Sequence, residues 1–373
     1  MTSQDNPSTP GGTTLSTRRK FLIGAGATSV AGVAGCLSGG STASSGGEYS
    51  GQTLKVTAWG GVYAEAFNEY VKPQFEEETG ATLQVIEGAS GLLSKIKAAP
   101  EDDPPYDVTI AEGYYYYAGR QDDLFEEVRY ENVPNMEQVY PYLKDQRTMK
   151  YGTPSTGSPL AIIYRKDIGW DPSEWSDLVT NEAEKVSVDG GFFIYPYMAA
   201  AIISDAKPSI EELYDESTYE DAFSTLESMD IVSFQGGGSN EVMLKELRQG
   251  TTDIAQWYYS NSHKNIQEDE ELEIRLPENN ASYINMYCPV RGTQNRRLAE
   301  EFINYTIAEE TQNRWAESGS VMVNQNVEYP EYLQEIYPTS NEEFKKIAYP
   351  NWDIVGPNMN AFLDHFKNLK TGN

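Results

Sequence analysis

Residues 54–67 read LKVTAWGGVYAEAF, and this stretch predicts the fold class. Residues 54–59 alternate and are rich in strand-forming side chains, and Gly60-Gly61 then opens a helical pattern over 63–78 that closes at Gly80. Strand patterns follow at 81–87 and 106–111, with a helical pattern over 90–99 between them. Because strands that alternate with helices indicate a parallel sheet covered by helices, the sequence predicts an α/β fold.

The carboxyl ends of these strands carry the first candidate binding residues. In open α/β sheets, ligands bind beyond the carboxyl ends of the strands. Those ends are Trp59-Gly60-Gly61, Gly88-Ala89-Ser90 and Glu112-Gly113-Tyr114. We expect the three loops to converge on one cleft.

A second block begins at about residue 159. Strand patterns occur at 159–167, 185–190, 253–259 and 282–290, and helical patterns at 239–250 and 297–315. The body of the chain, about 320 residues, is long enough for two lobes with sizeable cores.

The N-terminal region has the pattern of an export signal. Residues 16–36 read STRRKFLIGAGATSVAGVAGC, with a cationic start, a short apolar centre and small residues before Cys36. Residues 17–22 resemble a twin-arginine signal, and Val33-Ala34-Gly35-Cys36 resembles a lipobox. We therefore expect 1–36 to be a twin-arginine lipoprotein signal, 37–52 to be a Gly/Ser-rich tether, and lipidated Cys36 to anchor the protein to the outer face of the cell membrane.

The charge of the chain excludes some classes of partner. The formal net charge is -29, and without Asp5, Arg18, Arg19 and Lys20 the 57 acidic and 28 basic residues become 56 and 25, a net charge of -31. Such a surface repels nucleic acid and anionic lipid. It is typical of a hydrated acidic face, as in proteins that stay soluble in concentrated salt.

Sequence patterns of catalytic or metal chemistry are missing. The chain has no G-x-x-x-x-G-K-[ST] motif, and EGASG at 87–91 misses the G-x-S-x-G nucleophile motif by one residue. Cys288 is the only cysteine after Cys36, and His263 and His365 have no metal-ligand spacing. We expect no catalytic residues, no metal site and no cofactor.

Five segments together resemble a known family. They are residues 56–67, 75–85, 105–116, 241–257 and 297–317, and in this order they resemble the extracellular solute-binding proteins of ABC importers, in the cluster that includes spermidine/putrescine-binding proteins. The resemblance implies a two-lobe, type II periplasmic-binding-protein-like fold, with a hinge and an interlobe ligand cleft. It implies a first lobe of 53–158 plus 286–320 and a second lobe of 159–285 plus 321–373. The implied partners are a small-molecule solute and an ABC permease with a separate ATPase, and we expect a monomer.

The resemblance also implies binding residues. Its aromatic wall, suited to alkylammonium groups, falls on Trp59, Tyr63, Tyr114, Trp257 and Tyr283. Asp189 matches a carboxylate of the second lobe, whereas Asn285 stands where the polyamine pattern has a carboxylate, and Glu112 at a strand end supplies another acid. A smaller cation with one ammonium, or a zwitterion, would need fewer acids. The candidate ligand-binding residues are Trp59, Tyr63, Ser90, Glu112, Tyr114, Asp189, Trp257, Tyr258, Tyr283 and Asn285.

Two other functions stay open at this point. Tyr258-Tyr259 is similar to the adjacent tyrosines of ferric-ion receptors, and Glu112 could add a hard oxygen ligand. An exported, lipid-anchored enzyme or adhesion module would use the same N-terminal signal.

Overall fold

The computed structural model describes residues 47–88, 91–145, 150–180, 182–236 and 240–372. The expected signal, Cys36 and Ser90 lie outside these residues. The body of the chain forms one compact unit from Gly46 onward.

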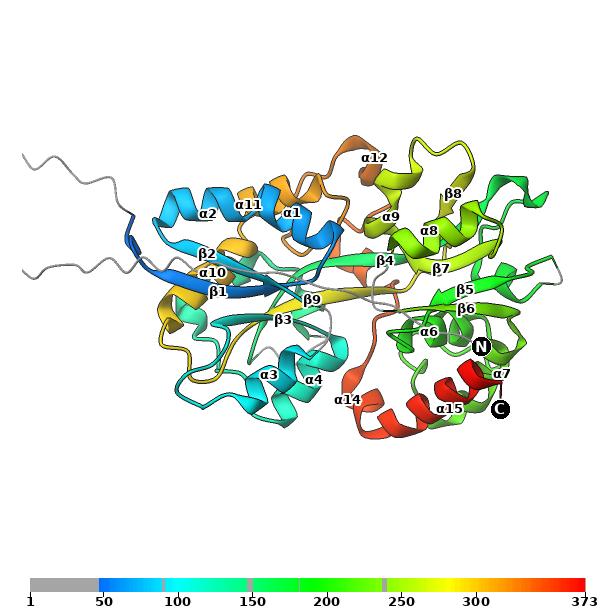
Figure 1. Ribbon diagram of the computed structural model, residues 1–373, viewed down its shortest axis with the longest axis horizontal. Coiled ribbons are helices and arrows are strands. Elements are labelled where there is room, and N and C mark those ends of the chain that lie inside the picture. The colour runs from blue at the N-terminus through cyan, green and yellow to red at the C-terminus, as the bar shows by residue number, and fades with distance from the viewer. Residues whose placement is uncertain (1–46, 89–90, 146–149, 181, 237–239, 373) are drawn as a thin grey trace, which may run out of the picture. The chain divides into compact units, whose positions relative to one another are not determined.

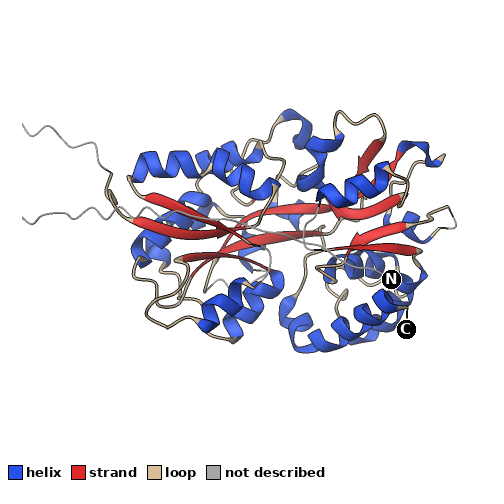
Figure 2. Cartoon of the chain, in the orientation of Figure 1, coloured by secondary structure: helices blue, strands red, loops and turns tan. Residues whose placement is uncertain are grey.

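Ten strands in the described residues form one sheet (Figures 1 and 2). Eight of them follow the order β2-β1-β3-β9-β4-β7-β5-β6, and β8 and β10 also pair with β4. The strands are β1 (Thr53–Ala58), β2 (Thr82–Glu87), β3 (Val108–Glu112), β4 (Thr153–Arg165), β5 (Val186–Asp189), β6 (Ile231–Gln235), β7 (Ile254–Tyr258), β8 (Leu272–Arg275), β9 (Ser282–Pro289) and β10 (Val321–Met322).

Helices cover both faces of this sheet, as Figure 2 shows. They are α1 (Val62–Tyr70), α2 (Lys72–Thr79), α3 (Leu92–Ala98), α4 (Gly113–Gln121), α5 (Pro141–Asp145), α6 (Ile194–Ile203), α7 (Tyr219–Ser228), α8 (Asn240–Arg248), α9 (Tyr259–Ile266), α10 (Arg296–Thr306), α11 (Glu309–Ala316), α12 (Glu331–Gln334), α13 (Asn341–Phe344), α14 (Trp352–Val355) and α15 (Met359–Thr371). Short 3-10 helices are η1 (Tyr130–Asn132), η2 (Pro134–Gln138), η3 (Lys166–Ile168), η4 (Trp175–Val179), η5 (Glu216–Thr218) and η6 (Gly356–Asn358). The predicted α/β alternation over 54–112 is confirmed, with β1, β2 and β3 parallel.

Two hydrophobic cores divide the body into two lobes. The first-lobe core includes Val56, Phe67, Phe302 and Trp315, and the second-lobe core includes Trp175, Tyr197, Leu247 and Phe362. The two-lobe α/β architecture expected from the sequence is therefore present.

The expected limits of the lobes need two corrections. Residues expected in the second lobe, among them Met322, Leu333 and Phe344, are buried in the first-lobe core, because β10 pairs with the N-terminal half of β4. Ala348 is the first residue after this segment to lie in the second-lobe core, Tyr349 still lies in the first, and the buried residues from Trp352 onward belong to the second. The folded body also begins before the expected Thr53, since Tyr49 is buried in the first core and its amide donates to the carbonyl of Thr79 at 3.0 Å.

Strand β4 joins the two lobes. Its residues 153–159 pair with β9 and its residues 160–165 pair with β7 and β8, so the strand changes lobes at Pro159-Leu160. The pairing of β4 with β9 shifts register between Pro154 and Gly157, and proline, which lacks an N–H, is compatible with such an irregularity. A Cβ atom at Gly157 would lie 2.2 Å from the carbonyl oxygen of Tyr283, so only glycine lets the two strands approach this closely.

Candidate functional site

Four strand ends bring functional side chains toward the junction of the lobes. Trp59 follows β1 and Glu112 ends β3 in the first lobe, whereas Asp189 ends β5 and Tyr258 ends β7 in the second. The long strands β4 and β9 run between these two sets (Figure 1). The arrangement follows the rule that parallel sheets bind ligands at their carboxyl edges.

On the first-lobe side, Asn285 of β9 fixes the indole of Trp59. The Trp59 Nε1 donates to Asn285 Oδ1 at 2.8 Å, and Asn285 Nδ2 donates to Thr156 Oγ1 at 3.3 Å. The Trp59 ring lies 5.7 Å from the ring of Tyr115. Glu112, only 3% exposed, is the direct cross-strand neighbour of Asn285.

On the second-lobe side, Asp189 is fully buried and hydrogen-bonded within its own lobe. Its Oδ1 accepts from the amides of Gly191 at 2.7 Å and Phe192 at 3.0 Å, and its Oδ2 accepts from the Tyr258 hydroxyl. Burial raises the pKa of Asp189, and these hydrogen bonds oppose the rise. The carboxylate thus shapes the loop that leads into α6.

Three tyrosines occupy the space between the two carboxylates. The rings of Tyr195, Tyr258 and Tyr283 pack with centroids 5.4 to 5.7 Å apart. Burial, followed by the charge of Glu112, raises the pKa of Tyr195 and of Tyr283 above the usual range, so these hydroxyls stay protonated donors.

A hydrogen bond crosses between the lobes at this point. The Tyr195 hydroxyl, at the start of α6, donates to the carboxylate of Glu112 at the end of β3. Tyr115 and Phe192 add an aromatic contact across the same junction, with ring centroids 6.4 Å apart. Separation of the lobes would therefore expose Glu112 to a solute.

A small pocket lies beside this cluster, at the hinge. Its free volume is about 10 Å³, which is no more than the 10 to 15 Å³ that one water molecule needs. A solute of several heavy atoms can enter only if the lining moves apart. The lining residues are Val62, Tyr63, Ala66, Thr156, Gly157, Ser260, Asn261, Tyr283, Asn285, Ser318 and Ser320.

Most of the sequence-predicted residues lie in this region. Tyr63, Tyr283 and Asn285 line the pocket, and Trp59, Glu112, Asp189 and Tyr258 belong to the surrounding network. The Tyr63 hydroxyl lies 3.2 Å from that of Tyr287, and burial raises its pKa to about 12. That these residues bind solute stays a prediction.

Two predicted residues lie elsewhere. Tyr114 is 38% exposed and its ring is 5.8 Å from that of Trp352, whereas its neighbour Tyr115 packs on Trp59. Trp257 is completely buried in the second-lobe core and does not line the pocket.

Sequence reasoning missed Tyr115, Tyr195, Thr156 and Ser260. Tyr195 ends the run GGFFIY at 190–195, which directly follows Asp189. An aromatic residue at the first turn of the helix after β5 is the signal that could have identified it.

Tyr258 and Tyr259 do not form a common metal site. Tyr258 donates to Asp189, whereas the Tyr259 ring stacks on His263 at 5.3 Å and contacts Tyr337 at 5.9 Å. Tyr258 is buried in the second-lobe core whereas Tyr259 packs against the first, so the two hydroxyls do not converge. No cluster of three or more His, Cys, Asp or Glu side chains suited to a metal occurs in the described residues.

Contacts on either side of the junction also link the lobes. Arg120 of α4 forms an ion pair with Asp353 of α14 at 2.6 Å. The indole of Trp352 sits against Gly113, where φ is 43° and a Cβ atom would lie 2.2 Å from the Trp352 Nε1. The Lys264 ammonium lies 5.9 Å from the ring centroid of Tyr70.

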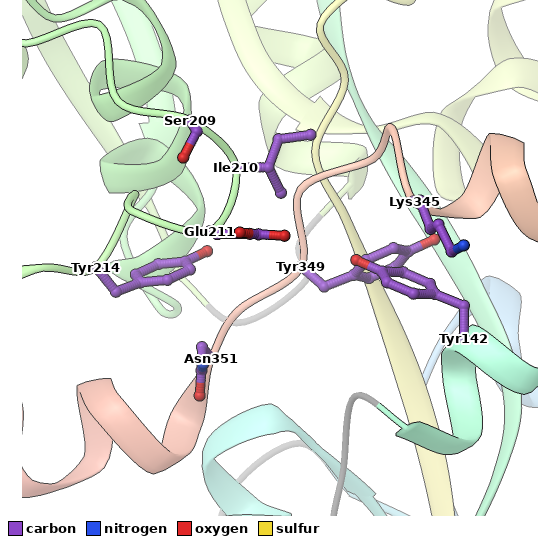
Figure 3. Close-up of a pocket in the computed structure, with 8 residues that line it drawn as sticks. All are labelled: Tyr142, Ser209, Ile210, Glu211, Tyr214, Lys345, Tyr349 and Asn351. Carbon is purple, nitrogen blue, oxygen red and sulfur yellow. The ribbon is translucent and has the colours of Figure 1, made fainter.

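A larger cavity of about 820 Å³ lies away from the strand ends (Figure 3). Tyr142 of α5, the loop containing Glu211 and Tyr214, and the connecting segment with Tyr349 and Asn351 line it. The acids and aromatic side chains of the strand-end network do not reach this cavity.

A family model described as "Bacterial extracellular solute-binding protein" matches residues 70–337 of the 373. No curated protein matches the sequence closely enough to count as a relative. No helix among the described residues has the length and apolar character needed to span a membrane.

Solved structures share the fold at low sequence identity. One is the spermidine/putrescine substrate-binding protein PotD of Streptococcus pneumoniae, solved in complex with calcium and HEPES. It is 20% identical to this chain with a TM-score of 0.69, and the match covers 86% of this chain and 99% of the PotD chain. An ABC transporter substrate-binding protein of Bradyrhizobium japonicum is 16% identical with a TM-score of 0.73, and the match covers 85% of this chain and 99% of that protein. MotA of A. tumefaciens, in complex with glucopine, is 12% identical with a TM-score of 0.71, and the match covers 85% of this chain and 99% of the MotA chain.

Proposed function

Because the chain belongs to the family of bacterial extracellular solute-binding proteins, we propose that it is the receptor component of an ABC importer and captures a small cationic or zwitterionic solute between its lobes. The proposed partners are a membrane permease and a separate ATPase, to which the receptor delivers the solute. Structural neighbours such as PotD support this assignment through their shared fold.

One observation carries the proposal. Glu112 of the first lobe and Asp189 of the second end their strands at the same tyrosine cluster, and the Tyr195 hydroxyl already bridges the lobes to Glu112. A cationic group would be attracted to the Glu112 carboxylate and to the faces of the surrounding rings, and each cation–π contact with a ring is worth about 0.5 to 2 kcal/mol. In the present conformation Tyr195 occupies that position.

Solute capture then follows from hinge motion. Opening the lobes separates Tyr195 from Glu112 and enlarges the small pocket, and closing them around a solute restores contacts from both sides. A ligand that binds only the folded protein raises its stability by RT ln(1 + [L]/Kd).

A thermal-shift screen tests the receptor function. The screen compares cationic, zwitterionic, neutral and anionic solutes on the full body of the protein. We expect a stabilising cation or zwitterion, and we expect Glu112→Gln to reduce its affinity by at least tenfold, about 1.4 kcal/mol. A protein that no solute stabilises would refute the assignment, and chemical conversion of the solute would favour an enzyme.

We further propose that the chain is exported by the twin-arginine route, lipidated at Cys36 and held on the outer face of the membrane. The support is the ordered pair of signals in residues 17–22 and 33–36. Cys36→Ser should release the protein into the medium. Continued association of this variant with membranes would contradict the anchor.

A further inference from the structure

The charged groups of the junction are not equally available to a solute. Asp189 has no exposed surface, and its two oxygens accept three hydrogen bonds, all from the second lobe: the amides of Gly191 and Phe192 and the hydroxyl of Tyr258. Breaking these bonds would leave buried polar groups without partners, which destabilises the fold. Asp189 therefore acts inside its own lobe.

The side chain of Asn285 is likewise held by hydrogen bonds, in this case within the first lobe. Its amide oxygen accepts from Trp59 and its amide nitrogen donates to Thr156, and the residue is 1% exposed. It lies directly opposite Glu112 in the β3-β9 pair. A second carboxylate in that position would repel Glu112, since like charges directly opposite each other destabilise a sheet.

The remaining surface of the hinge pocket is neutral. Its polar groups are hydroxyls and amides, from Tyr63, Thr156, Ser260, Asn261, Tyr283, Asn285, Ser318 and Ser320, and none of the described lining residues is charged. Burying a charge without an opposite charge is unfavourable, whereas a neutral hydroxyl can be hydrogen-bonded by these side chains.

From these three observations we propose that the cleft takes a solute with a single cationic centre, which meets Glu112, and with uncharged hydrogen-bonding groups, which meet the hinge pocket. Asn285 is the residue that sets this charge specificity, because it keeps the position opposite Glu112 neutral. The inference rests on the proposed receptor function and narrows the class of solutes that the receptor binds. Diamines and longer polyamines fall outside this class.

A matched pair of probes tests the proposal. Putrescine carries two ammonium groups, and aminobutanol replaces one of them by a hydroxyl on the same carbon chain. Isothermal titration and direct competition between the two should show that the wild-type protein prefers aminobutanol by at least about tenfold. Equal or tighter binding of putrescine would overturn the proposal without any variant being needed.

The variant Asn285→Asp tests the role of the residue. A carboxylate there can still accept from Trp59 and can accept from the hydroxyl of Thr156, so the variant should fold, which circular dichroism checks. The preference should shift toward putrescine by at least about tenfold. The control Asn358→Asp adds the same charge at an exposed position in the second lobe and should leave the preference unchanged.

The outcomes separate this inference from the receptor function. If a zwitterionic, neutral or anionic solute stabilises the protein and neither amine binds, the receptor function stands and the charge specificity is wrong. An unchanged preference in Asn285→Asp also overturns it. If no solute of any class binds, the receptor function itself fails.

Discussion

The burial of His263 predicts a loss of stability in mild acid. The ring lies between Tyr259 and Tyr332, with centroid distances of 5.3 and 5.8 Å, and a Cβ atom at Gly319 would lie 1.9 Å from it. Burial, with a smaller contribution from the Lys264 charge, lowers the pKa of His263 from 6.5 to about 4. The unfolded chain thus binds a proton between pH 6.5 and 4 that the folded protein does not.

The direction and size of the effect follow from this difference. The contribution of neutral His263 is fully present above pH 6.5, is lost as the pH falls to about 4, and changes no further below that value. The loss amounts to about 3 kcal/mol, at 1.36 kcal/mol for each pH unit between the two pKa values.

Urea unfolding at a series of pH values measures the effect. His263→Phe keeps a ring between the two tyrosines but cannot titrate, so its unfolding free energy should fall less steeply between pH 6.5 and 4.5 than that of the wild type. The carboxylates titrate in both proteins and cancel in the comparison. Equal slopes for the wild type and His263→Phe would refute the reasoning.

Three further predictions concern stability and reactivity. Arg120→Ala breaks the ion pair with Asp353, and because Asp353 is 60% exposed, the unfolding free energy should fall by only about 0.5 kcal/mol in urea titrations. Adding Asp353→Asn to this variant should lower the unfolding free energy no further, whereas additive losses in the double variant would contradict the prediction. Trp315→Ala empties a fully buried site in the first lobe and should cost about 3 to 5 kcal/mol in the same assay, so a loss below 1 kcal/mol would count against its core position. Burial raises the pKa of the Cys288 thiol, which should react with a thiol reagent only in denaturant; rapid reaction of the native protein would show that the thiol is accessible.

The sequence predicted the elements that depend on local pattern. The alternation over 54–112 gave β1, β2 and β3, and the strand-end rule located Trp59 and Glu112 at the junction. These predictions succeeded because the side-chain period and the position of a strand end are local properties of the chain.

The sequence did not predict which of two adjacent aromatic side chains faces the junction of the lobes. Tyr114 and Tyr115 are adjacent on α4, and residues one apart on a helix point about 100° apart, so only the docking of the helix decides which ring meets Trp59. Trp257 and Tyr258 are adjacent on β7 and face opposite sides, and the strand register decides which side is the junction.

Contacts between residues far apart in the chain could not be predicted from the local sequence pattern. The two-residue strand β10 carries almost no periodic signal, yet its pairing with β4 places the following segment in the first lobe. The contact of Tyr195 with Glu112 likewise joins residues from different lobes and depends on how those lobes meet.

A crystal structure of the protein with the solute that gives the largest thermal shift tests the central claim most directly. We predict that the solute lies between Trp59, Glu112 and Tyr258, with its cationic centre against Glu112 and Tyr195 displaced. A solute in the cavity lined by Tyr142 and Tyr214, with the Tyr195 to Glu112 hydrogen bond intact, would contradict the account.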